Sequence, residues 1–269
     1  MAPFSWPYPT YLLHLNLTNR QILRRTYDFF DLDDTLLDTQ RINRSIFEQI
    51  HKQLKVSMPF EDFMALFRTH LRTRMIKHFD FSYNESIGIN PMDYLMTQEA
   101  YEPQHMEAFK EDLWSKMKGL GLTCSKEDFY QVIMDLRNDF CHFIPGIPEL
   151  LEKAADLDDL GVITNGISEI QHLKIDLLGL RNICKETFAS GDFGYGKPDP
   201  RFFHYVLDQA GLDPQDCIMI GDNVQNDVLA PLAMDFKGAI YFNPQATRYG
   251  VTWARNPQEL WEKISSFYH

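Results

Sequence analysis

Two pairs of aspartates in this sequence each follow a short apolar run. Asp31 and Asp33 follow one run, and Asp222 and Asp227 follow another. Carboxylate oxygens bind divalent cations such as Mg²⁺ well, and a pair of carboxylates can also divide two tasks, one attacking an electrophile and the other moving a proton. Acidic turns after strands are also common without such a role, so each pair alone leaves its function open.

Two further segments carry groups suited to an anion. Thr164, Asn165 and Gly166 offer a hydroxyl, an amide and backbone N–H groups, all of which can donate hydrogen bonds to phosphate oxygens. Lys197 lies in the proline-containing segment 196–200, where a fixed ammonium group could neutralise phosphate charge. Each signal is weak alone, because Asn-Gly is a common turn and a loop lysine is usually solvated.

The elements that must position these groups are visible as short apolar runs separated by amphipathic stretches of helical length. This alternation is typical of parallel strands joined by crossover helices. Each run ends in a polar or glycine-containing segment, and an open parallel sheet places its ligand site at that edge. The sequence predicts strands at 27–32, 161–164, 217–221 and 239–242, and helices at 148–155, 167–178, 200–210 and 257–267.

Between 39 and 142 the pattern changes. Helical stripes such as Ile46, Ile50 and Leu54 replace the alternation, and strand-like runs are few. We therefore predict a mostly helical insertion directly after the first strand. The predicted organisation is an amino-terminal extension at 1–25, a core at 26–38 and 143–269, and the helical insertion at 39–142.

The order and spacing of these motifs resemble the four motifs of the haloacid dehalogenase-like superfamily. They read DLDDT at 31–35, TNG at 164–166, GKPDP at 196–200 and GDNVQND at 221–227, and the resemblance spans about 27–243. It implies an α/β fold in which a doubly wound parallel sheet forms a Rossmann-like core. It also implies that the helical insertion is a cap domain of the type that follows the first motif.

The resemblance further implies a role for each motif residue, with Mg²⁺ as the cofactor. The implied nucleophile is Asp31, and the implied general acid and base is Asp33. Thr164 and Lys197 would hold the transferring phosphoryl group, with Thr35, Asn165 and Gly166 as further phosphate-binding residues. The implied metal site consists of Asp31, Asp33, Asp222 and Asp227, with Asp222 the expected direct ligand.

Asp33 bears on the type of reaction. The dehalogenase branch of the superfamily lacks the second aspartate of the first motif, and this chain keeps it. An ester oxygen needs a proton as it leaves and a halide does not, so the resemblance favours phosphoryl transfer over carbon–halogen cleavage. The TNG motif and the cap type are similar to nucleoside monophosphatases and N-acylneuraminate phosphatases, and also to phosphoglycolate phosphatase-like members.

The insertion contains a cluster of basic residues that includes Arg68, Arg72 and Arg74. Such a cluster could recognise a second anionic group on the substrate. A solvated helix face is the competing interpretation, and the sequence favours it.

Composition limits the classes of partner. The chain has 269 residues, 44% of them hydrophobic, and a formal net charge of -12. The negative charge argues against binding to nucleic acid polymers, and no apolar run approaches the roughly 18 residues that a membrane helix needs. The four cysteines form no CxxC pair, which is typical of reduced thiols in a cytoplasmic protein. We expect a monomer or homodimer that acts on a small-molecule phosphoester.

The resulting functional hypothesis is a Mg²⁺-dependent phosphatase that hydrolyses a small phosphomonoester, a nucleoside monophosphate or a sugar phosphate, through an aspartyl-phosphate intermediate. Two alternatives stay open. A phosphomutase would use the same residues but return the phosphoryl group to the sugar. A catalytically idle protein would use the cap to bind a partner.

Overall fold

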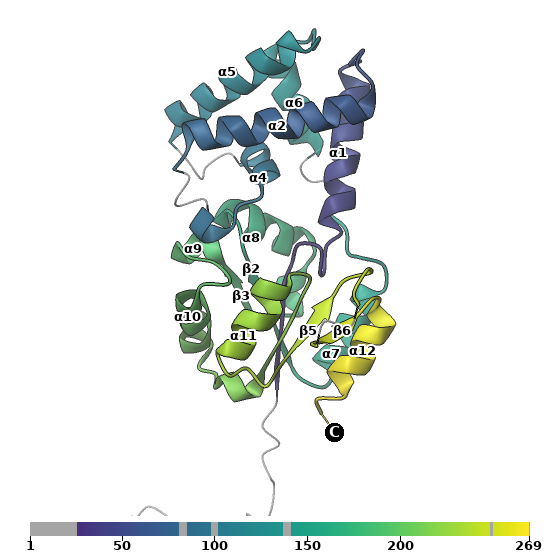
Figure 1. The fold of residues 1–269 in the computed structure, drawn as a ribbon, viewed down its shortest axis with the longest axis vertical. Helices are drawn as coiled ribbons and strands as arrows, with labels where there is room; N and C mark the ends of the chain where they lie inside the picture. Colours follow the sequence, from purple (N-terminus) through teal and green to yellow (C-terminus); the bar gives the residue numbers. More distant parts are fainter. Residues whose placement is uncertain (1–25, 81–84, 98–101, 137–140, 248–249, 269) are drawn as a thin grey trace, which may run out of the picture.

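The computed structural model of this chain describes residues 26–80, 85–97, 102–136, 141–247 and 250–268. Its centre is a parallel sheet of six strands in the order β3-β2-β1-β4-β5-β6 (Figure 1). This is a doubly wound order that reverses direction beside the first strand. The strands are β1 (Tyr27–Phe30), β2 (Asp159–Thr164), β3 (Glu186–Ala189), β4 (Cys217–Gly221), β5 (Gly238–Phe242) and β6 (Thr252–Ala254).

The central strands are buried on both faces, which explains their continuous apolar sequences. All residues of β1 and β4 are buried. Phe30 of β1 is in register with Val162 of β2 on one side and with Ile220 of β4 on the other. This pairing places the residues that follow β1, β2 and β4 at one edge of the sheet.

Helices cover both faces of the sheet (Figure 1). Phe30 packs in one hydrophobic cluster with Leu151 and Leu260, and Phe29 packs in another with Phe202 and Phe203. The helices of the first cluster are α7 (Ile147–Ala155), α8 (Ser168–Leu177) and α12 (Pro257–Ser265), and those of the second are α10 (Pro200–Ala210) and α11 (Ala230–Ala233). The α/β fold with a doubly wound parallel sheet, predicted from the sequence, is confirmed.

A group of helices lies above the carboxyl ends of the strands (Figure 1). They share a hydrophobic cluster that includes Phe47, Phe67, Phe109 and Phe129. The helices are α1 (Thr39–Gln53), α2 (Phe60–His78), α4 (Pro91–Met96), α5 (Pro103–Gly119) and α6 (Lys126–Leu136). Ile170 of α8 belongs to the same cluster, so α8 is one place where this cap contacts the core. We keep 39–142 as the proposed extent of the cap.

The two connections between core and cap lie side by side. Leu37, on the way out, forms an antiparallel bridge with Phe143, on the way back. The Ile144 N–H then donates to the Leu36 carbonyl at 2.8 Å. The chain thus leaves and re-enters the core at one place.

Two sequence predictions concern the remaining parts of the chain. The predicted amino-terminal extension at 1–25 lies outside the described residues. No helix in the described part of the chain has both the length and the apolar character needed to cross a membrane.

Candidate active site

A pocket opens at the carboxyl edge of the sheet, below the cap. The residues after β1, β2 and β4 line it together with the loop that carries Lys197 and the cap segment 85–90. All four sequence motifs therefore meet in one place. The predicted site residues in its lining are Asp31, Asp33, Thr164, Asn165, Lys197, Asp222 and Asp227.

Asp31 lies at the floor of this pocket, directly after β1. Its Oδ1 accepts a hydrogen bond from Lys197 Nζ at 2.7 Å, and its Oδ2 lies 3.5 Å from the Thr35 hydroxyl, which donates to it. Burial raises the pKa of Asp31 well above its usual range, and the Lys197 ammonium opposes that rise. Thr35 is fully buried and lies outside the pocket lining, so the structure shows it as a support for Asp31.

Lys197 is held close to Asp31 by several contacts. Its ammonium also donates to Asp227 Oδ1 at 2.6 Å, and its side chain is only 2% exposed. Asn165 binds the backbone of Lys197 at both ends, because its Oδ1 accepts from the Lys197 N–H at 2.8 Å and its Nδ2 donates to the Lys197 carbonyl at 2.7 Å. The Gly166 N–H donates to Ser190 Oγ at 2.9 Å. Direct phosphate binding by Asn165 and Gly166 therefore stays a prediction, since the structure shows both groups holding the site together.

Three carboxylates converge where a cation would bind. Asp31, Asp222 and Asp227 each place an oxygen within 4.8 Å of the others. Burial, with the neighbouring Asp227 and Asp34 carboxylates, raises the pKa of Asp222 to about 7. A bound divalent cation would relieve this repulsion, and an all-oxygen donor set suits Mg²⁺. These three residues therefore fit the ion that the sequence implied.

Close packing at the end of β4 explains the glycine of the fourth motif. A Cβ added at Gly221 would lie 2.3 Å from Asp227 Cγ, a distance that no real side chain allows. Asp227 is itself fixed, because its Oδ2 accepts from the Asn223 N–H at 3.0 Å. Glycine at this position therefore lets the second aspartate of the motif turn back onto the strand end.

Asp33 does not belong to this group of three carboxylates. Lys174 Nζ donates to both of its oxygens, at 2.9 and 3.0 Å, and the Thr39 hydroxyl donates to Oδ1 at 2.5 Å. Lys174 Nζ also lies 3.5 Å from Asp93 Oδ1 of the cap. A role for the Asp33 side chain in metal binding thus stays a prediction. The sequence analysis missed Lys174, because one lysine on an amphipathic helix carries no motif.

The three basic residues singled out in the cap lie on α2. Arg68 and Arg72 are exposed, and the Arg68 guanidinium lies 5.4 Å from the centre of the Phe47 ring. Arg74 Nε donates to Asp112 at 3.3 Å. None of the three lines the pocket that contains Asp31. Their predicted contact with substrate stays untested, and the structure does not bring them together with the motif residues.

Apart from Thr39 of α1, the cap residues that line the pocket lie in the segment 85–90, which the sequence analysis did not single out. It contributes Glu85, Gly88, Ile89 and Asn90 to the lining. Backbone contacts seat it on the core, since the Gly196 N–H donates to the Ser86 carbonyl at 2.7 Å. A Cβ added at Gly88 would lie 2.6 Å from Asn165 Nδ2, so the segment passes very close to the loop that carries Asn165.

Comparison with known proteins decides the family. The family model for haloacid dehalogenase-like hydrolases matches residues 29–235, which include all four motifs. The chain belongs to this family. The prediction made from the motifs is thereby confirmed.

Several relatives of known activity are phosphatases. The chain is 26% identical over 207 residues to phosphoserine phosphatase of Thermus thermophilus, covering 74% of this chain and 81% of the relative. It is 25% identical to the pyrimidine nucleotidase YjjG of Escherichia coli, over 55% of this chain and 75% of the relative. It is 22% identical to human N-acylneuraminate phosphatase, over 80% and 81% of the two chains. The chain is therefore a phosphoric monoester hydrolase of this family.

Solved structures share the fold. The HAD-hydrolase YfnB of Bacillus subtilis, crystallised with magnesium, aligns with a TM-score of 0.64 at 20% identity, covering 90% of this chain and 99% of that one. A haloacid dehalogenase from Pseudomonas syringae aligns with a TM-score of 0.56 at 22% identity, over 90% and 99% of the two chains. Because phosphatases and dehalogenases share this fold, the fold alone does not distinguish their reactions.

Proposed function

We propose that this chain is a Mg²⁺-dependent phosphatase that hydrolyses a small phosphomonoester through a phosphorylated Asp31. The observation that carries the proposal is the placement of Asp31. Its carboxylate lies at the floor of an open pocket, bonded to Lys197 and beside two further carboxylates that suit a cation. A buried carboxylate with a fixed ammonium group at its side is suited to attack a phosphorus atom whose charge is neutralised.

The proposed reaction has two steps. In the first, an Asp31 oxygen attacks phosphorus, the ester P–O bond breaks, and the leaving oxygen takes a proton from Asp33. In the second, Asp33 takes a proton from water while the water oxygen attacks the phosphorus on Asp31, which releases phosphate and restores the carboxylate. Lys197 neutralises charge on the transferring group. Mg²⁺ held by Asp31, Asp222 and Asp227 would supply further charge neutralisation when bound.

The pocket outside the phosphoryl position favours a neutral leaving group. Among its described lining residues Lys197 is the sole cation, and both Asp31 and Asp227 already bind its ammonium. The cap side of the pocket offers the Glu85 carboxylate, the apolar Ile89 and the Asn90 amide. These side chains suit a neutral, hydroxyl-rich leaving group such as a sugar or nucleoside. They disfavour a second anion on the substrate, because like charges in a confined site repel.

The proposal is tested by phosphate release from a panel of phosphoesters, with and without EDTA. We expect Mg²⁺-dependent release with water as the only acceptor, which also distinguishes hydrolysis from mutase activity. Within the panel, ethylene glycol monophosphate and phosphoglycolate form a matched pair, with a neutral and an anionic leaving group of the same skeleton. A kcat/KM that is higher for phosphoglycolate contradicts the neutral-group proposal, and no release from any ester contradicts the phosphatase proposal.

A further inference from the structure

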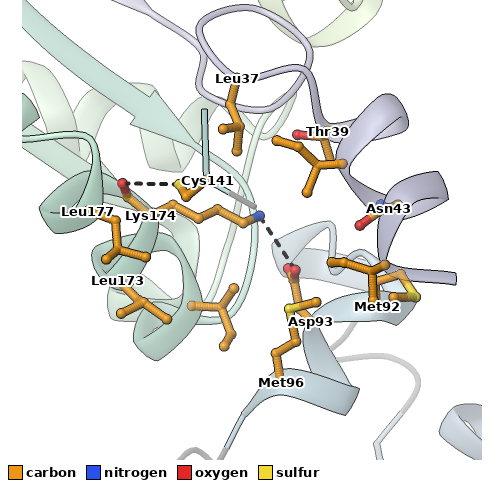
Figure 2. Close-up of a pocket in the computed structure, with 13 residues that line it drawn as sticks. Leu37, Thr39, Asn43, Met92, Asp93, Met96, Cys141, Leu173, Lys174 and Leu177 are labelled. Carbon is orange, nitrogen blue, oxygen red and sulfur yellow. Dashed lines mark hydrogen bonds and ion pairs between the residues drawn. The ribbon is translucent and has the colours of Figure 1, made fainter. Parts of the chain in front are cut away.

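Lys174 of α8 lies between two carboxylates from different parts of the molecule. Its Nζ donates to both oxygens of Asp33 in the core and lies 3.5 Å from Asp93 Oδ1 in the cap. Figure 2 shows the extended Lys174 side chain reaching from α8 towards Asp93 on α4. The two carboxylates are 60 positions apart in the sequence, and this ammonium group joins them.

The ion pair between Lys174 and Asp93 is largely shielded from solvent. The side chains of Lys174 and Asp93 are only 14% and 4% exposed. The Gln171 amide lies beside them, and in the orientation that satisfies both of its ends it donates to Asp33 Oδ2 at 3.2 Å and accepts from Lys174 Nζ at 3.2 Å. The Thr39 hydroxyl, from the lining of the Asp31 pocket, donates to Asp33 Oδ1, so Lys174, Gln171 and Thr39 together orient this carboxylate.

A second polar contact of α4 with α8 lies one helical turn along from the first. Thr97, four residues after Asp93, donates from its hydroxyl to Glu169 Oε2 at 2.5 Å. Ile170, between Glu169 and Lys174, packs in the hydrophobic cluster of the cap. The position of Asp93 relative to Lys174 is therefore fixed by packing and by a separate hydrogen bond.

We propose that Lys174 is a positioning residue for Asp33, and that Asp93 ties its ammonium group to the cap. The placement of the acid–base carboxylate then depends on α4 being seated on α8. This inference rests on the proposed function, because it assigns Lys174 a part in proton transfer by Asp33. Lys174 itself does not line the pocket that contains Asp31, so it acts only through Asp33.

The test uses Lys174→Met, which keeps an unbranched side chain of similar length but removes the charge. Single-turnover measurements would follow phosphorylation of the enzyme by an alkyl phosphate and by p-nitrophenyl phosphate. A poor leaving group needs a proton from Asp33 and nitrophenolate does not. We expect phosphorylation by the alkyl phosphate to slow about 10- to 100-fold while the nitrophenol burst rate changes less than about threefold. Lys185→Met is the matched control, since Lys185 pairs with Asp159 at the surface of the core.

Asp93→Asn provides an independent measurement that leaves Lys174 in place. We expect the same dependence on the leaving group but a smaller effect, and the double variant should be no slower than Lys174→Met alone, because the two changes act through one ammonium group. Thermal unfolding of each variant shows whether the fold is retained.

Equal slowing with both substrates in the Lys174→Met or Asp93→Asn variant would overturn the proposal and leave Lys174 as a structural ion pair. A Lys174→Met enzyme as active as the Lys185→Met control would overturn it as well. Neither result affects the phosphatase proposal, which fails separately if wild-type protein releases no phosphate.

Discussion

Asp31 and Asp33 of the first motif each bind a different lysine. Lys197 binds Asp31, and Lys174 binds Asp33, although the two carboxylates are only two positions apart in the chain. Asp31 and Asp33 therefore lie in two different environments. Asp31 is close to Asp222 and Asp227, and Asp33 is linked through Lys174 to Asp93 of the cap. Separate environments are what two carboxylates need when one attacks and the other transfers protons.

Replacing Asp31, the proposed nucleophile, gives the sharpest test at the scale of single residues. Asp31→Asn should reduce turnover to below about 1% of the wild-type rate, because an amide does not form the phosphorylated intermediate. The fold should be retained, since Asn fills nearly the same volume and Lys197 keeps Asp227 as a partner. Phosphate release and thermal unfolding are the measurements. Activity of several per cent, with deamidation excluded by mass spectrometry, would contradict the assignment.

Replacing one of the three converging carboxylates should weaken the binding of Mg²⁺. Asp222→Asn removes one of the three converging charges, so the Mg²⁺ concentration for half-maximal activity should rise by at least about tenfold. Asp208→Asn is a suitable control, because Asp208 is exposed and belongs neither to the pocket lining nor to the group of three. An unchanged Mg²⁺ midpoint in the Asp222 variant would show that the cation binds elsewhere.

At the scale of elements, the buried strands could be predicted and the edge strands could not. β4 is a continuous apolar run, and its predicted bounds, 217–221, agree with those in the structure. β3 begins with an exposed Glu186, and β6 has only three residues, so neither shows the pattern of a buried strand. Edge strands have one neighbour and are partly exposed, which leaves their hydrophobic pattern weak.

Among the site residues, too, some could be predicted from the sequence and others could not. Motif residues close together in sequence, such as Asp31 and Asp33, could be found because their spacing is itself the signal. Lys174 and Glu85 could not, because their place in the site depends on how the cap sits on the core. Contacts over such sequence distances leave no local pattern in a single sequence.

The exposed face of α2 allows a test of the basic cluster. Because Arg68 and Arg72 lie outside the pocket lining, the double change to Gln should leave KM for phosphoglycolate and for ethylene glycol monophosphate within about twofold of wild type. Steady-state kinetics on both esters checks this. A KM that rises for phosphoglycolate alone would show that the cap basic residues do recognise a second anion, as the sequence allowed.

For Arg74 a different result is expected. Its Nε bonds the half-buried Asp112, which Lys77 Nζ also binds at 2.5 Å. These contacts hold the pKa of Asp112 well below its usual range. Arg74 therefore contributes to the packing of α2 on α5, and its replacement belongs in a stability experiment, separate from the double variant.

At the scale of the whole molecule, the buried carboxylate of Asp28 in β1 is expected to contribute to the way stability responds to pH. Asp28 of β1 is fully buried, and its Oδ2 accepts from the Tyr268 hydroxyl at 2.5 Å. Burial raises the pKa of Asp28 from an ordinary value of 3.8 to about 7. The folded state thus holds this proton more tightly than the unfolded state does.

The raised pKa of Asp28 determines how its contribution to stability changes with pH. The contribution of Asp28 to stability is fully present below about pH 4 and is lost as the pH rises to about 7, at a limiting slope of about 1.4 kcal/mol per pH unit. Asp28→Asn should remove this part of the pH dependence, so its urea midpoint should fall less than that of wild type between pH 5 and pH 8. The exposed Asp208→Asn serves as a control. Parallel curves for wild type and Asp28→Asn would contradict the assignment.

The adjoining connections at Leu37 and Phe143 have a consequence for how this chain can be engineered. For the core, the segment between Leu37 and Phe143 acts as one long loop whose two ends are already held together by this bridge. The entropy of closing a loop grows only slowly with its length, so a cap of different size costs the core little. A cap from another family member, joined at this bridge, should therefore be accepted by the folded core and carry its own specificity with it.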